Sequence, residues 1–161
     1  MNENPGTEII VSGDRVAYLN GEIGYATFLS LIQANETETI RYLELNSPGG
    51  IIEPAIFIGN YLKEEKISAV VVNECASACA LIAFNSHKLL TNEQALFGFH
   101  NARSLAKADS ERGRFNSELE SERMFSKFAQ LGIPERILRK ARGTAPNEMH
   151  YVSGLEFVKF V

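Results

Sequence analysis

Ser77 lies between two small residues and two cysteines in the stretch NECASACALIAF, which runs from Asn73 to Phe84. The residues after it are apolar on every side of a helix, so a helix that begins here should be buried. A serine in this place can cap the helix by accepting a backbone N–H. It can also act as a nucleophile, with the free N–H groups of the first helical turn stabilising an oxyanion.

Ser47-Pro48-Gly49-Gly50 follows the strand-like run IRYLELN and precedes a helical pattern. Such a segment can be a simple turn, as most Pro-Gly pairs are. Two consecutive glycines also allow bare backbone to approach a ligand and to point N–H groups at it. The Walker and dinucleotide-binding patterns of glycine and lysine are missing, so this segment is not a phosphate loop.

His100 ends the apolar run ALFGFH and is one of three histidines, the others being His87 and His150. At the end of a strand its side chain can emerge from the sheet edge, or it can be a satisfied structural residue. Cys75 and Cys79 are too few for a disulfide framework or a structural zinc site. We expect them to be buried small residues, with a disulfide or redox pair as the alternative.

The composition limits the kinds of protein and partner to consider. The chain has 161 residues, 45% of them hydrophobic and 22% charged, and a net charge of −4. This is typical of one globular domain, and without a basic stripe nucleic acid is not expected as a partner. The polar start MNENPGTE is unlike a signal peptide, and no run approaches the ~20 apolar residues of a membrane span. No metal or organic cofactor is implied.

Apolar periodicity predicts alternating strands and helices, and hence an α/β fold with crossover helices. Strands are expected over 8–13 and 15–23 (a hairpin turning at Gly13-Asp14), 40–46, 67–73, 87–91 and 95–100. Helices are expected over 25–35, 51–66, 78–84, 109–131, 135–142 and 153–161.

Taken together, LELNSPGG, ECASACALIAF and GFHNA resemble the Clp-type serine peptidases in order and spacing. Ser77 follows Gly50 by 27 residues, and His100 follows Ser77 by 23. The resemblance covers Glu8 to Phe157 and is closest to a ClpP-like branch with cysteines around the serine, often found in the bacterial envelope.

The resemblance implies a single ClpP-like domain over residues 1–161, a ClpP/crotonase-type spiral of ββα units. Ser77 would be the nucleophile of a serine peptidase and His100 its general base. The N–H groups of Gly50 and Ala78, with the flexible Gly49, would form the oxyanion hole. A helical arm at about 105–143 would assemble a homo-oligomer. Peptides or proteins would be the substrate, and an unfoldase or membrane partner stays open. A periplasmic or envelope location is favoured, with the cytoplasm possible.

The chain departs from the family where a third catalytic residue, an aspartate, is expected, because Met149 stands there. Glu148 carries the charge best suited to an imidazolium, Asn147 could only orient the ring, and His150 is third choice. Without such a residue the site would be a Ser-His dyad, or a non-catalytic assembly or binding module. A crotonase-like acyl-CoA enzyme and a Ser-Lys peptidase using Lys88 are further alternatives.

Overall fold

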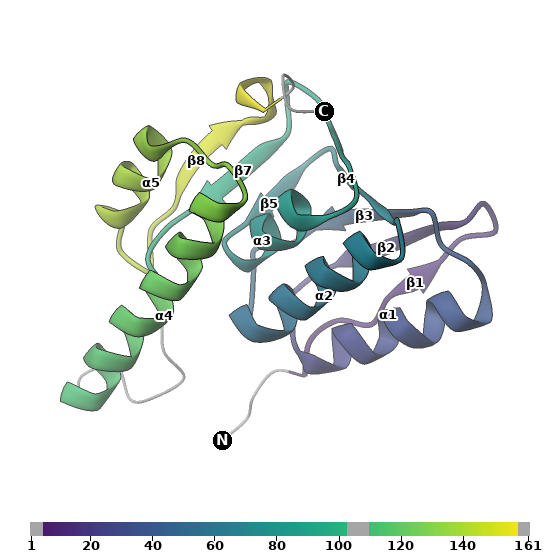
Figure 1. Cartoon of the computed structure of the whole chain (residues 1–161), viewed down its shortest axis with the longest axis horizontal. Coiled ribbons are helices and arrows are strands. Elements are labelled where there is room, and N and C mark those ends of the chain that lie inside the picture. The colour runs from purple at the N-terminus through teal and green to yellow at the C-terminus, as the bar shows by residue number, and fades with distance from the viewer. Residues whose placement is uncertain (1–4, 103–109, 158–161) are drawn as a thin grey trace.

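The computed structural model of the chain describes residues 5–102 and 110–157, which form a mixed α/β structure (Figure 1). The strands are β1 (Ile10–Val11), β2 (Val16–Asn20), β3 (Tyr42–Asn46), β4 (Ser68–Val71), β5 (Glu74–Ala76), β6 (Leu89–Thr91), β7 (Leu96–Phe99) and β8 (His150–Ser153). The helices are α1 (Tyr25–Thr37), α2 (Ile52–Glu64), α3 (Ala78–Asn85), α4 (Glu111–Gln130) and α5 (Glu135–Arg142), with a 3-10 turn η1 (Gly154–Glu156).

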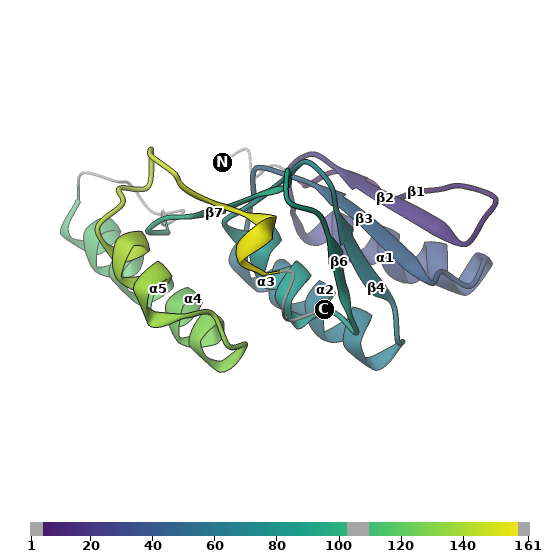
Figure 2. The same ribbon diagram turned by 90° about the horizontal axis from the view of Figure 1, so that it is seen from above.

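The strands form two sheets. The larger has the order β1-β2-β3-β4-β6, in which only β1 is antiparallel to its neighbour. Helices α1 and α2 lie side by side on one face of it (Figures 1 and 2). The smaller has the order β5-β7-β8, with β5 parallel and β8 antiparallel to β7. An isolated bridge between Ser47 and Cys75 connects the end of β3 to β5, so the two sheets meet there.

Sequence pattern explains the core elements. In β3 the side chains of Leu43 and Leu45 point to the helix-covered face and are fully buried, while Tyr42 on the other face is exposed. Every residue of α3 from Ala78 to Ala83 is buried, as its all-round apolar character predicts. Apart from Ala76, the buried apolar residues of the described chain form one continuous cluster.

Most predicted elements are confirmed, including the hairpin of β1 and β2, in which Ile10 pairs with Tyr18. The sequence patterns missed β5 and β8. The helix expected over 153–161 is wrong within the described residues, because Ser153 ends β8 and only Gly154–Glu156 make a single 3-10 turn. Residues 158–161 of that expected helix lie outside the described chain.

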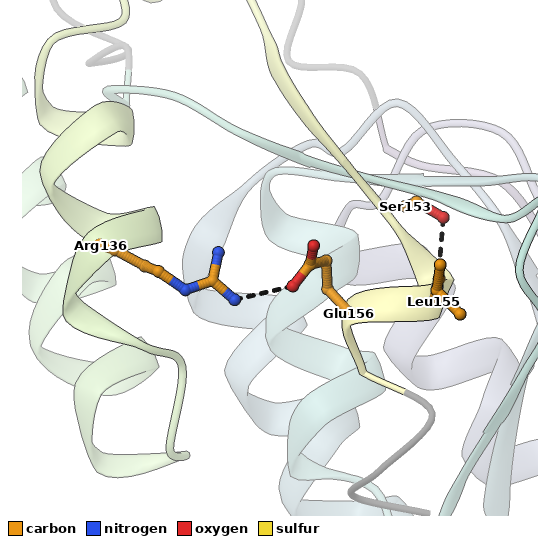
Figure 3. A network of polar contacts seen from close by, with 4 residues as sticks. All are labelled: Arg136, Ser153, Leu155 and Glu156. Atoms are coloured by element: carbon orange, nitrogen blue, oxygen red, sulfur yellow. Dashed lines mark hydrogen bonds and ion pairs between the residues drawn. The ribbon is translucent and has the colours of Figure 1, made fainter.

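The C-terminal segment is tied to the helical arm by the polar contacts drawn in Figure 3. Arg136 on α5 and Glu156 on η1 form an ion pair with N–O distance 2.7 Å, and Ser153 Oγ accepts a hydrogen bond from the N–H of Leu155. Phe157 then packs edge-on against Phe84 and Phe97. The ion pair and the ring contacts fix the segment after β8 against α5, α3 and β7.

Of the arm expected at about 105–143, residues 110–143 are described, and they form α4 and α5 with a break at Gly132-Ile133-Pro134. Met124, Phe125 and Phe128 on α4 are buried in the molecule's own core, and the Phe128 ring lies 5.2 Å from that of Phe99. The N-terminal half of α4 extends away from the sheets (Figure 1). None of the helices in 5–102 or 110–157 is long and apolar enough to cross a membrane.

Candidate active site

Three chain segments meet at one edge of the small sheet. They are the turn that follows β3, the junction of β5 with α3, and the end of β7. Ser47 bridges to Cys75, and in the parallel pair β5–β7 Ala76 lies opposite Gly98. Parallel strands end at the same edge of a sheet, which is where α/β proteins build their sites. The structure therefore brings together the three motifs that the sequence analysis selected.

The backbone of Ser77 is held in an unusual conformation, with φ 56° and ψ −121°. This region is disfavoured for a residue with a Cβ and costs about 1–3 kcal/mol. Two hydrogen bonds maintain it: the Ser77 N–H donates to Gly98 O at 2.7 Å, and the Ala80 N–H donates to Ser77 O at 2.9 Å. A strained serine at a strand-to-helix turn is also found in the nucleophile elbow of α/β-hydrolases.

The helix-cap interpretation of Ser77 is wrong. Ser77 occupies the N-cap position of α3, but its side chain accepts no hydrogen bond from the helix. Within the described chain the Ser77 Oγ makes no hydrogen bond, and in particular none to His100. The hydroxyl is therefore not committed to a structural role.

The glycine turn lies directly beside this serine. Gly49 has φ 116°, and a Cβ added to it would lie 2.9 Å from the Ser77 Cβ, so only glycine allows this approach. Gly50 has φ 154° and pairs with Ile23, whose carbonyl oxygen would clash with a Cβ added there. Ser47, which is buried, fixes the turn by accepting the Gly49 N–H at 3.1 Å.

Two backbone N–H groups at this edge are available as donors. Those of Gly50 and Ala78 donate to no acceptor in residues 5–102 and 110–157. Ala78 is the first residue of α3, so its N–H belongs to the first turn, where helices leave donors unpaired. The N–H of Gly49, the third group expected at the oxyanion hole, is instead used inside the turn. Gly49 thus contributes space, not a donor.

His100 follows the last residue of β7 and is half-buried. Because Ala76 lies opposite Gly98, Ser77 is level with Phe99, and His100 is one position further along the neighbouring strand. Both residues thus lie at the same edge of adjacent strands, although no hydrogen bond joins them. Contacts between catalytic groups are often long in an empty site and shorten when substrate binds.

The structure does not connect the candidate third residues to His100. The side chains of Asn147 and Glu148 are exposed and make no hydrogen bond or ion pair with the described residues. Continuing the register in which Phe99 pairs with His150 puts Met149 opposite His100. The Met149 side chain packs on Gly98, where a Cβ would approach its sulfur to 2.7 Å. The apolar thioether of Met149 therefore occupies the space beside the end of β7, where His100 follows.

Cys75 and Cys79 form a disulfide, which corrects the expectation of two separate buried residues. The bond joins β5 to the first turn of α3 and spans Ser77, two residues away on either side. Both cysteines are fully buried. Their i,i+4 spacing was the available sequence signal, but it fits a bonded and an unbonded pair equally well.

The ionisable groups on β8 have shifted pKa values. Burial, and then the positive charge of Lys140, lowers the pKa of His150. Tyr151 crosses β7 above Gly98 and donates a 2.6 Å hydrogen bond to Glu74, which raises the pKa of the tyrosine. His150 pairs with Phe99 and forms part of the strand, not of the serine turn.

Across residues 5–102 and 110–157, no three His, Cys, Asp or Glu side chains are grouped to hold a metal ion. A surface hollow of about 360 Å³ lies between Tyr18, Glu44 and Val72, and neither Ser77 nor His100 lines it. Neither the protein-family models nor the curated proteins compared with this chain gave a match.

Proposed function

We propose that this chain is a serine hydrolase of the ClpP-like type that cleaves peptide bonds through an acyl-enzyme on Ser77. The observation that carries the proposal is the backbone of Ser77. A non-glycine residue is kept at φ 56°, makes no capping bond, and lies beside two unengaged N–H groups. Strain that brings no structural benefit to the helix is typical of functional residues.

In the proposed mechanism, Ser77 Oγ attacks the substrate carbonyl carbon while His100 takes the hydroxyl proton. Negative charge then develops on the carbonyl oxygen, and the N–H groups of Gly50 and Ala78 stabilise it. His100 donates the proton to the leaving amine, the C–N bond breaks, and an ester on Ser77 is left. A water, deprotonated by His100, hydrolyses that ester and regenerates the serine.

The order of the elements supports a ClpP/crotonase-type spiral for this fold. The units β4-β5-α3 and β6-β7-α4 each consist of two strands followed by a helix. In each unit the first strand extends the large sheet and the second extends the small sheet. The β3 unit follows the same plan, with Ser47 pairing to β5 before α2 begins. Successive turns of a spiral would produce this arrangement.

The disulfide supports a location for this activity. Disulfides persist in oxidising compartments such as the bacterial periplasm and are rare in the cytosol. The Cys75–Cys79 bond therefore favours the cell envelope for a hydrolase of this kind.

A non-catalytic assembly or binding module is the second candidate, and Met149 is the observation that favours it. A thioether is only a weak hydrogen-bond acceptor and cannot stabilise an imidazolium as a carboxylate does. Under this alternative the serine turn would persist as a structural remnant.

A fluorophosphonate probe, followed by peptide mapping, tests the proposal. Ser77 Oγ would attack phosphorus, fluoride would leave, and a stable phosphonate ester would remain on Ser77 alone. We expect Ser77→Ala and His100→Ala to abolish labelling, whereas Ser86→Ala, a matched control at the other end of α3, should not.

We expect Glu148→Gln and Asn147→Ala to leave the labelling rate unchanged. Both side chains are exposed and make no hydrogen bond or ion pair with residues 5–102 and 110–157. A large loss in Glu148→Gln would instead identify Glu148 as the third catalytic residue. No labelling of the wild type, under conditions where a control hydrolase reacts, would favour the non-catalytic module.

A further inference from the structure

The Cys75–Cys79 disulfide joins the residues two positions before and two positions after the strained Ser77. Cys75 belongs to β5 and Cys79 to the first turn of α3, so the bond closes the turn whose centre is Ser77. We propose that the two cysteines are positioning residues: their bond keeps Ser77 in the conformation that presents its hydroxyl. The inference rests on the proposed function for its activity readout, but its conformational claim stands independently.

The length of the loop shows where such a bond acts. In the chain-entropy account a disulfide stabilises a protein by restricting the unfolded chain, and the effect grows with the number of residues enclosed. Here the cysteines are only four residues apart. The bond therefore restricts little of the unfolded chain as a whole, and its main effect falls on the backbone between Cys75 and Cys79.

A competing conformation of the turn explains why a restraint is needed. Serine at a helix N-cap ordinarily has negative φ, and its hydroxyl accepts the N–H of the second or third helical residue. For Ser77 these donors are Cys79 and Ala80. Relaxation into that state would relieve the strain at φ 56° and engage the hydroxyl with the helix. A covalent link from β5 to α3 opposes this relaxation.

Burial makes the bond a permanent restraint. Both cysteines have 0% exposure, so a reductant cannot reach the sulfurs while the domain is folded. The hydrogen bond from the Ser77 N–H to Gly98 O acts in the same direction, since it fixes the turn to β7. Together they fix Ser77 to one neighbouring strand and to its own helix.

The test compares the wild type with the double variant Cys75→Ala/Cys79→Ala. Phosphonylation by the fluorophosphonate is measured over a range of probe concentrations, so that probe binding and the covalent step are separated. We expect the rate constant of the covalent step to fall by about 10²-fold, the usual effect of a small misplacement of a reacting group, with probe binding unchanged.

Leu62→Ala is the matched control for lost stability. Leu62 is fully buried near the end of α2, where the chain turns toward the start of β4, at the sheet edge opposite to Ser77. Each protein is assayed at the same interval below its own Tm. The control should phosphonylate at the wild-type rate, and an equal loss in both variants would show a general effect of destabilisation and overturn the proposal.

The backbone φ of Ser77, measured by NMR chemical shifts and scalar couplings, gives a readout that needs no activity. We expect positive φ in the wild type and negative φ in the double variant. If the wild type is not labelled, the proposed function fails, and this measurement still decides the role of the disulfide. Positive φ retained in the double variant would overturn the positioning role. A double variant that does not fold would also overturn the positioning role, because the disulfide would then be needed for the stability of the whole domain.

Discussion

The proposed chemistry and the observed backbone at position 77 make opposite demands on the side chain. A nucleophile requires a hydroxyl and therefore a Cβ, whereas the backbone at φ 56° favours glycine. This backbone conformation costs an L-residue about 1–3 kcal/mol. Because no capping bond offsets this cost, Ser77 is a residue whose presence lowers stability.

This strain predicts an order of stabilities at position 77. Ser77→Gly should raise the free energy of unfolding by about 1 kcal/mol, after the greater freedom of glycine in the unfolded chain is allowed for. That corresponds to about 2–4 °C in Tm for a chain of this size. Ser77→Ala, which keeps the strain and loses no cap, should unfold close to the wild type. Thermal unfolding followed by circular dichroism measures all three.

A helix-cap role predicts a different order, in which serine is the most stable, glycine follows and alanine is the least stable. A wild type more stable than Ser77→Gly would therefore contradict the strain argument. Both variants should lose fluorophosphonate labelling whichever order is found, since neither has a hydroxyl.

Among the elements, the pairing of β8 with β7 has a titratable group, His150, at the end where β8 begins. Burial and Lys140 lower the pKa of His150 below its unfolded value, so the folded state binds fewer protons than the unfolded state. Stability from this group is complete above the ordinary histidine pKa near 6.5. This stability is lost as the pH falls from about 6.5 toward the folded-state pKa of His150, because the imidazolium then forms close to the positive charge of Lys140.

We therefore expect NMR titration to give His150 a pKa below that of an unfolded peptide, and Lys140→Gln to raise it. His150→Gln should reduce the loss of stability between neutral and mildly acidic pH. Lys63→Gln, which removes a charge of the same sign from α2, serves as the control. Equal effects of the two lysine variants would show a response to net charge and not to the neighbouring residue.

For the whole molecule, the resemblance predicted that the helical arm assembles a homo-oligomer. The arm carries an apolar stripe: Leu119, Met124, Phe125, Phe128 and Leu131. The structure divides this stripe. The three middle residues are buried against the chain's own core, whereas Leu119 is 53% exposed. Phe115, one helical turn before Leu119, is 61% exposed. Any interface on α4 must therefore involve its projecting N-terminal half.

Leu119→Glu combined with Phe115→Glu should lower the mass measured by light scattering after size-exclusion chromatography and leave the Tm near that of the wild type. The reason is that a charge on an exposed helix face weakens an interface without entering the core. Phe125→Glu is the contrasting variant and should unfold the domain, because it buries a charge. A wild-type monomer at high protein concentration would contradict self-association.

What the sequence could predict about this protein follows from local pattern. The hairpin, the buried α3 and the helices of the arm are visible because periodicity 2 or 3.6 marks which face of an element is buried. The order of the glycine turn, Ser77 and His100 identified the residues that the fold then brings to one sheet edge. These residues each follow a strand, and parallel strands end together.

Tertiary structure alone decided the remaining features. β5 and β8 have only three and four residues, too few for a clear alternation, and they exist because β7 pairs with both. The spacing of Cys75 and Cys79 allowed a bond but did not require one. The positive φ of Ser77 could not be predicted from the sequence, because glycine is the residue that usually indicates a positive φ. It is imposed by contacts with Gly98 and with the disulfide, which come from packing between segments and not from the residue's own preference.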